Sequence, residues 1–477
     1  MNTPAVVQRA LSERSDELTQ RLADELARVD VPGASFALAR GDDLVTGAAG
    51  VLSRATGYPV TADSYFQIGS VTKVFTASMV MQLVDEGRVG LDEPIRTYLP
   101  RFDVGDEAAS NAITVRHLLT HTSGIQGDYF ADFGRGTDAV SRYVASLREV
   151  GMLHEPGALF SYCNSGFSVL GLMLETLRGA DYGTLLTERL LRPLGIAGGT
   201  LPEEAIMHRA AIGHIADAAD KADGPAVPAP VWALPYSAGP AGSTPFMDAA
   251  GLVSFARMHL AGGVAPDGTR LLSEESVAEM QRLQAEVPSP GSVRGIGASW
   301  ALYGWADALV PGHDGGTHGQ YSFLRVHPAS GSVIVLLTNG PGGAELFQAF
   351  GQPLFAELTG LPEPEPLLPV TPPPDIDLER LAGTYLHHGV DVHVEVSENR
   401  ATVIAGPHAD SPASGEDENA DPAEEFVAIA HSVTDAAVFL VTEQPLHGSH
   451  QSVMFPAGPG EPEYLRLGSR VFMRAAS

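Results

Sequence analysis

The chain has 477 residues, of which 44% are apolar and 18% are charged, a composition typical of globular proteins. Asp and Glu total 58 against 29 Lys and Arg, so the formal net charge is −29. Phosphates of nucleic acid and anionic membrane surfaces would repel such a chain, so we expect neither as a partner. High solubility, or a high-salt cell interior, is the simplest explanation of the charge.

The cysteine content and the N-terminal segment indicate the cellular compartment in which the protein is expected. Cys163 is the one cysteine, which excludes an internal disulfide and a thiolate metal cluster. The N-terminal segment lacks the apolar run of a signal peptide, and no stretch of about 18 or more apolar residues follows. We therefore expect a cytoplasmic location.

Residues 1–360 have mixed α/β periodicity. Two short strands are predicted at 34–40 and 43–52, and a hairpin at 323–340 that turns at Ser330-Gly331. An Ala-, Asp- and Pro-rich segment at 217–230 is predicted to be a loop. Helices are predicted at five places: 5–28, from Ser70 to a Gly87 C-cap, 113–125, from Asn164 to Gly179, and from Ala344.

A change in composition divides the chain. Residues 361–376 contain seven prolines, which predicts a stiff extended linker. Residues 377–477 contain short alternating segments typical of an antiparallel β domain. Within it, 409–425 is acidic and lacks large apolar residues, which predicts a disordered loop. The N-terminal part, residues 1–360, is thus predicted to be α/β, and the C-terminal part, residues 377–477, to be a small β domain.

The sequence QIGSVTKVFTA, residues 67–77, contains Lys73, one of only two lysines in the chain. Ser70 and Lys73 are three residues apart at a predicted helix start, so their side chains share a face. Unlike arginine, lysine can lose its proton inside a protein. Burial and the positive field of a helix N-terminus both lower a lysine pKa. This spacing fits a Ser70 nucleophile with Lys73 as its base, and it equally fits a helix that has only a capping serine and a lysine in its first turn.

Two further motifs follow S-x-x-K in order. FSYCNSGF contains Tyr162 and Asn164, and VPGHDGGTHGQYSF contains His313 and Gly315. The order S-x-x-K, Y-x-N, H-x-G resembles the serine β-lactamase-like and penicillin-binding-protein-like group. That group includes class C β-lactamases, D-alanyl-D-alanine carboxypeptidases, D-aminopeptidases and family VIII esterases. HLLTHTSGI (117–125) fits the same group, and the resemblance covers about residues 10–358.

The resemblance implies a fold and roles for these residues. The fold would be an antiparallel sheet flanked by helices, with a helical subdomain and then a small lipocalin-like β-barrel. Ser70 would be acylated, with Lys73 and Tyr162 passing its proton. The N–H groups of Ser70 and Gly316 would form the oxyanion hole. Asn164, His313 and Gly315 would bind substrate, and positive charge on Lys73 and His313 would help Tyr162 act as a base.

His313 departs from the lysine usual in penicillin-recognising enzymes. Histidine is a weaker and pH-dependent anchor for a substrate carboxylate, which favours esters, amides or amino-terminal peptide substrates over β-lactams. His318 is a further candidate at the same mouth. The C-terminal module could stabilise or dimerise the protein, or one of its loops could narrow the mouth of the site.

Other potential ligands are interpreted as structural. His117 and His121 are four apart on the predicted 113–125 helix but lack an H-E-x-x-H motif, so we expect no metal. His387, His388 and His393 are predicted at the surface, and Cys163 as a buried inert thiol. No nucleotide-binding glycine pattern is present, so no cofactor is expected.

The predicted function is a serine acyl-transfer enzyme with an acyl-Ser70 intermediate and a small-molecule ester or amide as donor. Hydrolysis is the first expectation. The alternatives are a transacylase with an amine or alcohol acceptor and a non-catalytic binding or sensor protein. The identity of donor and acceptor depends on loops such as 126–140 and 285–300. The sequence does not indicate the oligomeric state.

Overall fold

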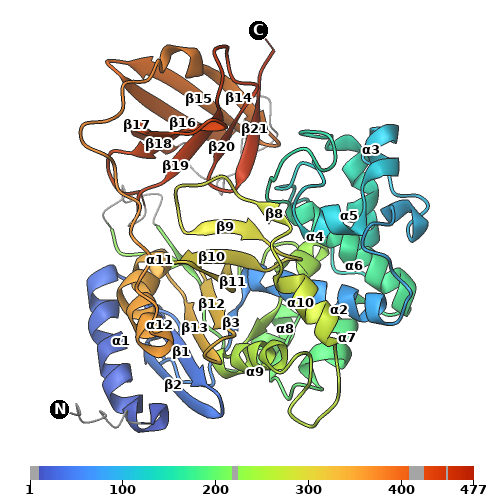
Figure 1. The fold of residues 1–477 in the computed structure, drawn as a ribbon. Coiled ribbons are helices and arrows are strands. Elements are labelled where there is room, and N and C mark those ends of the chain that lie inside the picture. The colour runs from blue at the N-terminus through green and yellow to red at the C-terminus, as the bar shows by residue number, and fades with distance from the viewer. Residues whose placement is uncertain (1–9, 217–223, 408–423, 447–448, 477) are drawn as a thin grey trace, which may run out of the picture.

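The structure is a computed structural model, and it describes residues 10–216, 224–407, 424–446 and 449–476. The N-terminal part of the chain forms a central sheet with helices on both faces, and the C-terminal part forms a closed barrel at one end of the molecule (Figure 1). The expected antiparallel sheet flanked by helices, followed by a small β-barrel, is confirmed. Within the described ranges, no helix is long and apolar enough to cross a membrane.

The central sheet has eight antiparallel strands in the order β2-β1-β13-β12-β11-β10-β9-β8. Its first and last strands in sequence are neighbours, because β1 pairs along its length with β13. The strands are β1 (Gly33–Arg40), β2 (Asp43–Gly50), β8 (Ala285–Glu286), β9 (Val293–Ile296), β10 (Ala301–Trp305), β11 (Ala308–Gly316), β12 (Tyr321–His327) and β13 (Ser332–Thr338).

Side chains of the central strands alternate between two cores. Phe36 and Leu336 face a core shared with α1 (Ser15–Val29) and α12 (Gln352–Thr359). Ala37 and Leu337 face the opposite core, shared with α2 (Thr72–Asp85) and α9 (Ala249–Leu260). This alternation is the period-two pattern of a sheet covered on both sides.

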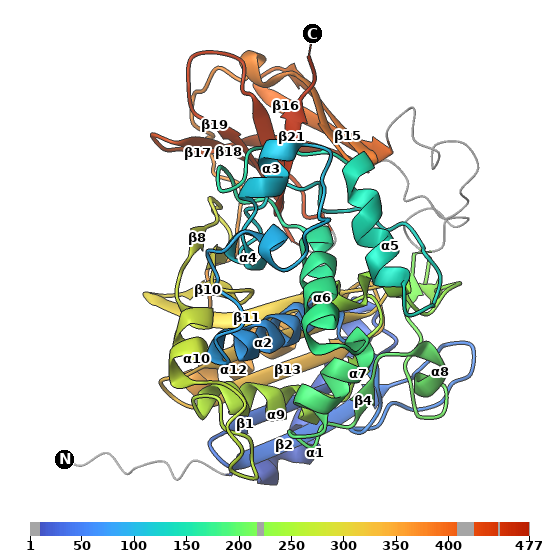
Figure 2. The same ribbon diagram turned by 90° about the vertical axis from the view of Figure 1, so that its right-hand side faces the viewer.

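Helices α2 to α7 gather on one side of the sheet (Figure 2). The long α6 starts next to the barrel and packs against α2 and α5. The remaining helices of this part are α3 (Glu107–Ala112), α4 (Val115–Leu119), α5 (Ala139–Ser146), α6 (Asn164–Arg178), α7 (Tyr182–Leu186), α8 (Pro202–Ala205), α10 (Glu274–Gln281) and α11 (Gly343–Leu346).

The C-terminal module is a closed eight-stranded barrel. Buried side chains from all its sides form one interior cluster, which includes Tyr385, Phe455 and Phe472. The strands are β14 (Gly383–His387), β15 (Val390–Ser397), β16 (Arg400–Pro407), β17 (Glu424–Val433), β18 (Ala437–Thr442), β19 (Ser452–Pro456), β20 (Tyr464–Leu467) and β21 (Arg470–Arg474). Between α12 and this barrel, residues 361–376 contain no helix or strand.

Several element predictions need correction. The helix predicted at 113–125 is only the five-residue α4, because the chain turns after it and His121 has a positive φ of 57°. The predicted 217–230 loop contains the short strand β6 (Val227–Pro228), while its residues 217–223 lie outside the described residues. Residues 409–423 of the predicted acidic loop also lie outside them, and Glu424 and Glu425 begin β17. The 5–28 helix is described only from Leu11 onward.

Candidate active site

Ser70 and Lys73 meet at the start of α2. Ser70 lies in a 3-10 turn, Gly69–Val71, that leads directly into the helix, and Lys73 lies in the first helical turn. The Lys73 amine is 2.9 Å from the Ser70 hydroxyl oxygen and donates a hydrogen bond to the Ala241 carbonyl at 2.6 Å. The i, i+3 spacing therefore brings the serine hydroxyl and the lysine amine into direct contact, as predicted.

Lys73 is fully buried, with no solvent exposure. Within the described part of the chain, its hydrogen-bond partners are a hydroxyl and a carbonyl, and no carboxylate forms an ion pair with it. Burial is the main cause that lowers the Lys73 pKa well below its usual value, and the nearby Arg470 guanidinium lowers that pKa further. A buried amine without an anionic partner favours its neutral form, which is the form that accepts a proton.

Tyr162 and Asn164 enter the site at the N-terminus of α6. The Tyr162 ring lies 4.9 Å from the Lys73 amine, and Tyr162 lines the same pocket as Ser70, which acts to lower the Tyr162 pKa. Burial raises the Tyr162 pKa above its ordinary value, so this phenol remains protonated at neutral pH. The Asn164 amide donates a hydrogen bond to Asp128 at 2.8 Å, and Tyr162 and Asn164 line the same pocket as Ser70.

Strand β11 brings the third motif against the Ser70 turn. A Cβ atom on Gly315 would lie 2.9 Å from the Ser70 nitrogen and 2.1 Å from the Ile68 oxygen. A Cβ atom on Gly69 would lie 2.6 Å from the Gly316 nitrogen. Glycine at both positions therefore lets the Ser70 and Gly316 backbones approach closely.

His313 lies on the same strand, and its exposed fraction is only 5%. Its Nδ1 is 2.6 Å from the Asp314 carbonyl oxygen, which can only accept, so the imidazole proton lies on Nδ1. Burial, reinforced by Lys73, lowers the His313 pKa to about 4. The expectation that His313 supplies positive charge to Tyr162 is therefore wrong at neutral pH, because burial keeps the ring neutral.

The positive charge next to Tyr162 comes instead from the barrel. Arg470 begins β21, and its guanidinium carbon lies 5.1 Å from the centre of the Tyr162 ring. The guanidinium forms a bidentate ion pair with Asp128, the carboxylate that also holds Asn164. The Tyr162 N–H donates to the Ser469 carbonyl in the turn before β21. A barrel hairpin is thus built into the site.

Sequence reasoning missed Asp128, Ser469 and Arg470. Asp128 lies in the 126–140 loop that the sequence singles out without naming a residue. A weak signal for the others was the Gly468-Ser469 pair, a two-residue turn between two strands, followed by a charged residue. The prediction that a barrel loop narrows the mouth applies to this turn, which lines the pocket.

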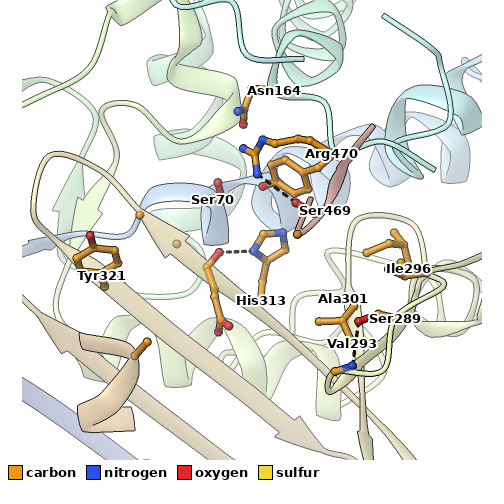
Figure 3. A pocket seen from close by; sticks show the side chains of 18 of the residues that line it. Ser70, Asn164, Ser289, Val293, Ile296, Ala301, His313, Tyr321, Ser469 and Arg470 are labelled. Atoms are coloured by element: carbon orange, nitrogen blue, oxygen red, sulfur yellow. Dashed lines mark hydrogen bonds between the residues drawn. The ribbon is translucent and has the colours of Figure 1, made fainter. Parts of the chain in front are cut away.

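A pocket of about 670 Å³ surrounds these residues. Figure 3 shows His313 between Ser70 and a group formed by Ser289, Val293, Ile296 and Ala301, with Tyr321 at the opposite end. Arg470 and Ser469 lie close to His313 on the barrel side. The predicted site residues Ser70, Tyr162, Asn164, His313, Gly315 and Gly316 all line this one pocket.

Residues interpreted as structural have identifiable contacts. Cys163 is buried, its sulfur accepts from the Gly166 N–H, and burial raises its pKa to about 11, as expected of an inert thiol. His121 stacks on Tyr162 with ring centres 4.2 Å apart, and its Nδ1 accepts from the Cys163 N–H. His387 is buried, so its predicted surface position is wrong. His318 lines a neighbouring pocket of about 420 Å³.

Comparison with known proteins identifies the family of the chain. A profile described as Beta-lactamase matches residues 18–351. Penicillin-binding protein 4 of Amycolatopsis lactamdurans is 45% identical over 363 residues, covering 75% of this chain and 94% of that protein. The crystal structure of SurE is 28% identical, with a TM-score of 0.74, and covers 97% of this chain and 99% of its own.

A more distant structure extends the likeness in fold alone. The octameric penicillin-binding protein homologue of Pyrococcus abyssi is 21% identical with a TM-score of 0.63, covering 96% of this chain and 99% of its own. The profile match spans most of the chain and includes the three motifs, so it establishes the family of the chain. The chain belongs to the Beta-lactamase family.

Proposed function

We propose that this protein is a serine acyl-transfer enzyme that hydrolyses an amide or ester through an acyl-Ser70 intermediate. The carrying observation is Lys73, a buried amine without a carboxylate partner that lies 2.9 Å from the Ser70 hydroxyl. Such an amine can accept the serine proton without first losing one to solvent.

In the acylation step, the Ser70 oxygen attacks the donor carbonyl while its proton passes to Lys73. The backbone N–H groups of Ser70 and Gly316 stabilise the developing oxyanion, a role favoured by the close approach of their two backbones. Tyr162, which is kept protonated by its burial and lines the pocket with Ser70, passes a proton to the leaving group. Lys73 restores that proton, so no net charge accumulates in the buried site.

Asn164 and Arg470 would position the donor. Asn164 has its amide nitrogen bound to Asp128, which leaves its carbonyl to accept from a substrate N–H. Arg470 adds a fixed positive charge to the pocket wall. SurE, similar along nearly the whole chain, has been crystallised with D-Leu, which supports a donor built from D-amino acids. We infer an amide or ester of a D-amino acid or peptide as the donor.

Transfer to an amine or alcohol is the second candidate. The observation that favours it is the pocket of about 670 Å³ that extends well beyond Ser70, since water as acceptor needs no such space. A non-catalytic sensor remains the third candidate, and the contact of Ser70 with both Lys73 and Tyr162 argues against it.

Intact-protein mass spectrometry tests the proposal. The protein would be mixed with p-nitrophenyl butyrate, D-phenylalaninamide, benzylpenicillin and a fluorophosphonate, with Ser70→Ala as the matched control. We expect a mass gain in the parent protein that is absent from the variant, and turnover of at least one amide or ester. If no reagent modifies Ser70, the sensor alternative replaces the enzyme.

A further inference from the structure

The oxyanion hole takes its two N–H groups, those of Ser70 and Gly316, from segments far apart in sequence, and a pair of buried glutamines joins these segments. We propose that Gln67 and Gln320 are positioning residues for the hole, whose side-chain amides set the distance between its two N–H groups. Each glutamine is only 1% exposed, and neither lines the pocket around Ser70. The inference rests on the proposed function and names the residues that hold its oxyanion site.

Gly316 is the last residue of β11, at the point where the pairing of β11 with β12 ends. It pairs with Tyr321, and the turn between them is closed by a hydrogen bond from the Thr317 N–H to the Gln320 carbonyl at 3.0 Å. A glycine has no side chain that could anchor it. The position of the Gly316 N–H therefore depends on what holds this turn.

Gln67, three residues before Ser70, holds both ends of that turn. Its Oε1 accepts from the Thr317 hydroxyl at 2.8 Å and from the Gln320 side-chain amide at 3.4 Å. In return, the Gln67 backbone N–H donates to the Gln320 Oε1 at 3.0 Å. The two glutamines thus form a closed ring of hydrogen bonds between the segment that leads into the nucleophile and the turn that follows Gly316.

The remaining amide hydrogens anchor this ring in the surrounding fold. The Gln67 Nε2 donates to the Ser243 carbonyl at 3.3 Å, and the Gln320 Nε2 donates to the Ala211 carbonyl at 3.3 Å. Each polar atom of the two side-chain amides therefore has a partner. Because these atoms are buried, rotating either amide would leave hydrogen-bonding groups unpaired away from water, which is costly.

The Ser70 side of the hole has its own support from the sheet. The Ser322 hydroxyl on β12 donates to the Ile68 carbonyl at 2.7 Å, and the same carbonyl accepts from the Val71 N–H at 3.2 Å. The glutamine ring extends this support to the turn after β11. Such precision matters for catalysis, because a misplacement of about 1 Å caused far from the reacting atoms can cost about 10²-fold in rate.

The test compares two donors that differ in the atom that enters the oxyanion hole. The full-length protein would be given p-nitrophenyl butyrate and its thionoester, in which sulfur replaces the carbonyl oxygen (or, if only amides react, D-phenylalaninamide and its thioamide). Sulfur is larger and accepts hydrogen bonds weakly, so a hole set for oxygen favours the oxygen donor. In Gln67→Leu and Gln320→Leu, kcat/KM for the oxygen donor should fall about 10- to 10²-fold, and the oxygen-to-sulfur ratio of kcat/KM about tenfold.

Three further variants locate the effect. Gln82→Leu is the matched control, because Gln82 is a buried glutamine near the other end of α2, with its amide bound to a backbone carbonyl, and the ratio should not change. Gln67→Glu is the conservative variant: burial keeps its carboxyl protonated at pH 6, so it can still accept from Thr317 and donate to Ser243, and the ratio should be retained. Should the leucine variants fail to fold, Thr317→Val removes one hydrogen bond at a half-buried position and should lower the ratio in the same direction.

The outcomes separate the two proposals. A parent protein that forms no acyl-Ser70 with any donor of the mass-spectrometry panel would overturn the proposed function and this inference together. An active parent whose oxygen-to-sulfur ratio stays the same in the folded Gln67 and Gln320 variants would overturn the inference alone. An equal fall of the ratio in Gln82→Leu would also overturn it, because the effect would then follow the loss of any buried amide.

Discussion

The two sides of the pocket achieve their electrostatics in opposite ways. On the catalytic-domain side, Lys73 and His313 are buried without carboxylate partners, and burial favours their neutral forms. On the barrel side, Arg470 keeps its charge, because Asp128 compensates it. Groups that burial favours in their neutral form, Lys73 and His313, thus lie on one side, and the charged Arg470 lies on the other. The barrel therefore contributes to the electrostatics of the site.

The largest expected effect comes from the catalytic-domain side. Lys73→Met keeps the side-chain volume but removes the base, so we expect kcat/KM for ester or amide donors to fall about 10²–10⁴-fold. The same change removes a buried amine that lacks an anionic partner, so Tm should stay the same or rise. Steady-state kinetics and thermal unfolding of the same preparation check both. A parallel fall in Tm would mean that the lysine is structural.

Removing one partner or the other of the Arg470–Asp128 ion pair should shift the Lys73 pKa in opposite directions. Arg470 lowers the Lys73 pKa and Asp128 raises it. Arg470→Met should therefore move the acidic limb of the kcat/KM–pH profile to higher pH, and Asp128→Asn should move it to lower pH. Shifts in the same direction would contradict this electrostatic account.

The same pair should also affect stability. Arg470→Met leaves Asp128 as an unpaired, largely buried charge. The loss should lie near the lower end of about 3–5 kcal/mol, because 34% of the Arg470 side chain is exposed. Denaturant unfolding measures it, and adding Asp128→Asn should recover part of the loss. A double variant no more stable than Arg470→Met would refute the ion-pair explanation.

His313 predicts a pH dependence of folding. Its pKa is about 4 in the folded protein against an ordinary value of 6.5, so the unfolded chain binds the proton more readily. Its contribution to stability is present above pH 6.5 and is lost as pH falls towards 4, by roughly 3 kcal/mol. His313→Gln should flatten this part of the curve, leaving a slope from other buried histidines, such as His259, whose pKa is about 3, and His121, whose pKa burial lowers well below 6.5. An unchanged slope would contradict a neutral His313.

Arg466 should show the smallest effect. It is buried, and burial lowers its pKa to about 10. Its side chain donates to two backbone carbonyls rather than to a carboxylate. Arg466→Met loses those hydrogen bonds but also removes a costly buried charge, so we expect about 1 kcal/mol or less in unfolding experiments. If Arg466→Met lost as much unfolding free energy as Arg470→Met, the two arginines would not differ in their contribution to stability as we expect.

Local patterns allowed much of the fold and the core of the site to be predicted. The Ser70–Lys73 contact follows from helical spacing, and the strands at 34–40 and 323–340 follow from alternation. Glycine at 315 matched a known motif, and the structure gives the physical reason as a close backbone approach. Each of these features depends on residues near one another in sequence.

What the sequence did not predict depends on distant contacts. Asp128 and Arg470 are separated by 342 positions, and nothing local indicates their pairing. The neutral state of His313 results from burial that several segments create together. The short α4 was mispredicted because the positive φ of His121 ends a pattern that otherwise looks helical. The boundaries at 360 and 377 and the cytoplasmic location stay predictions.

The pH dependence of Ser70 phosphonylation tests the central claim most directly. The rate of fluorophosphonate inactivation would be followed from pH 5 to 10, with the adduct located by mass spectrometry. We expect a single adduct on Ser70 and an acidic limb with an apparent pKa well below the ordinary lysine value of 10.5. An apparent pKa near that value, or an adduct on another residue, would contradict a neutral Lys73 as the base.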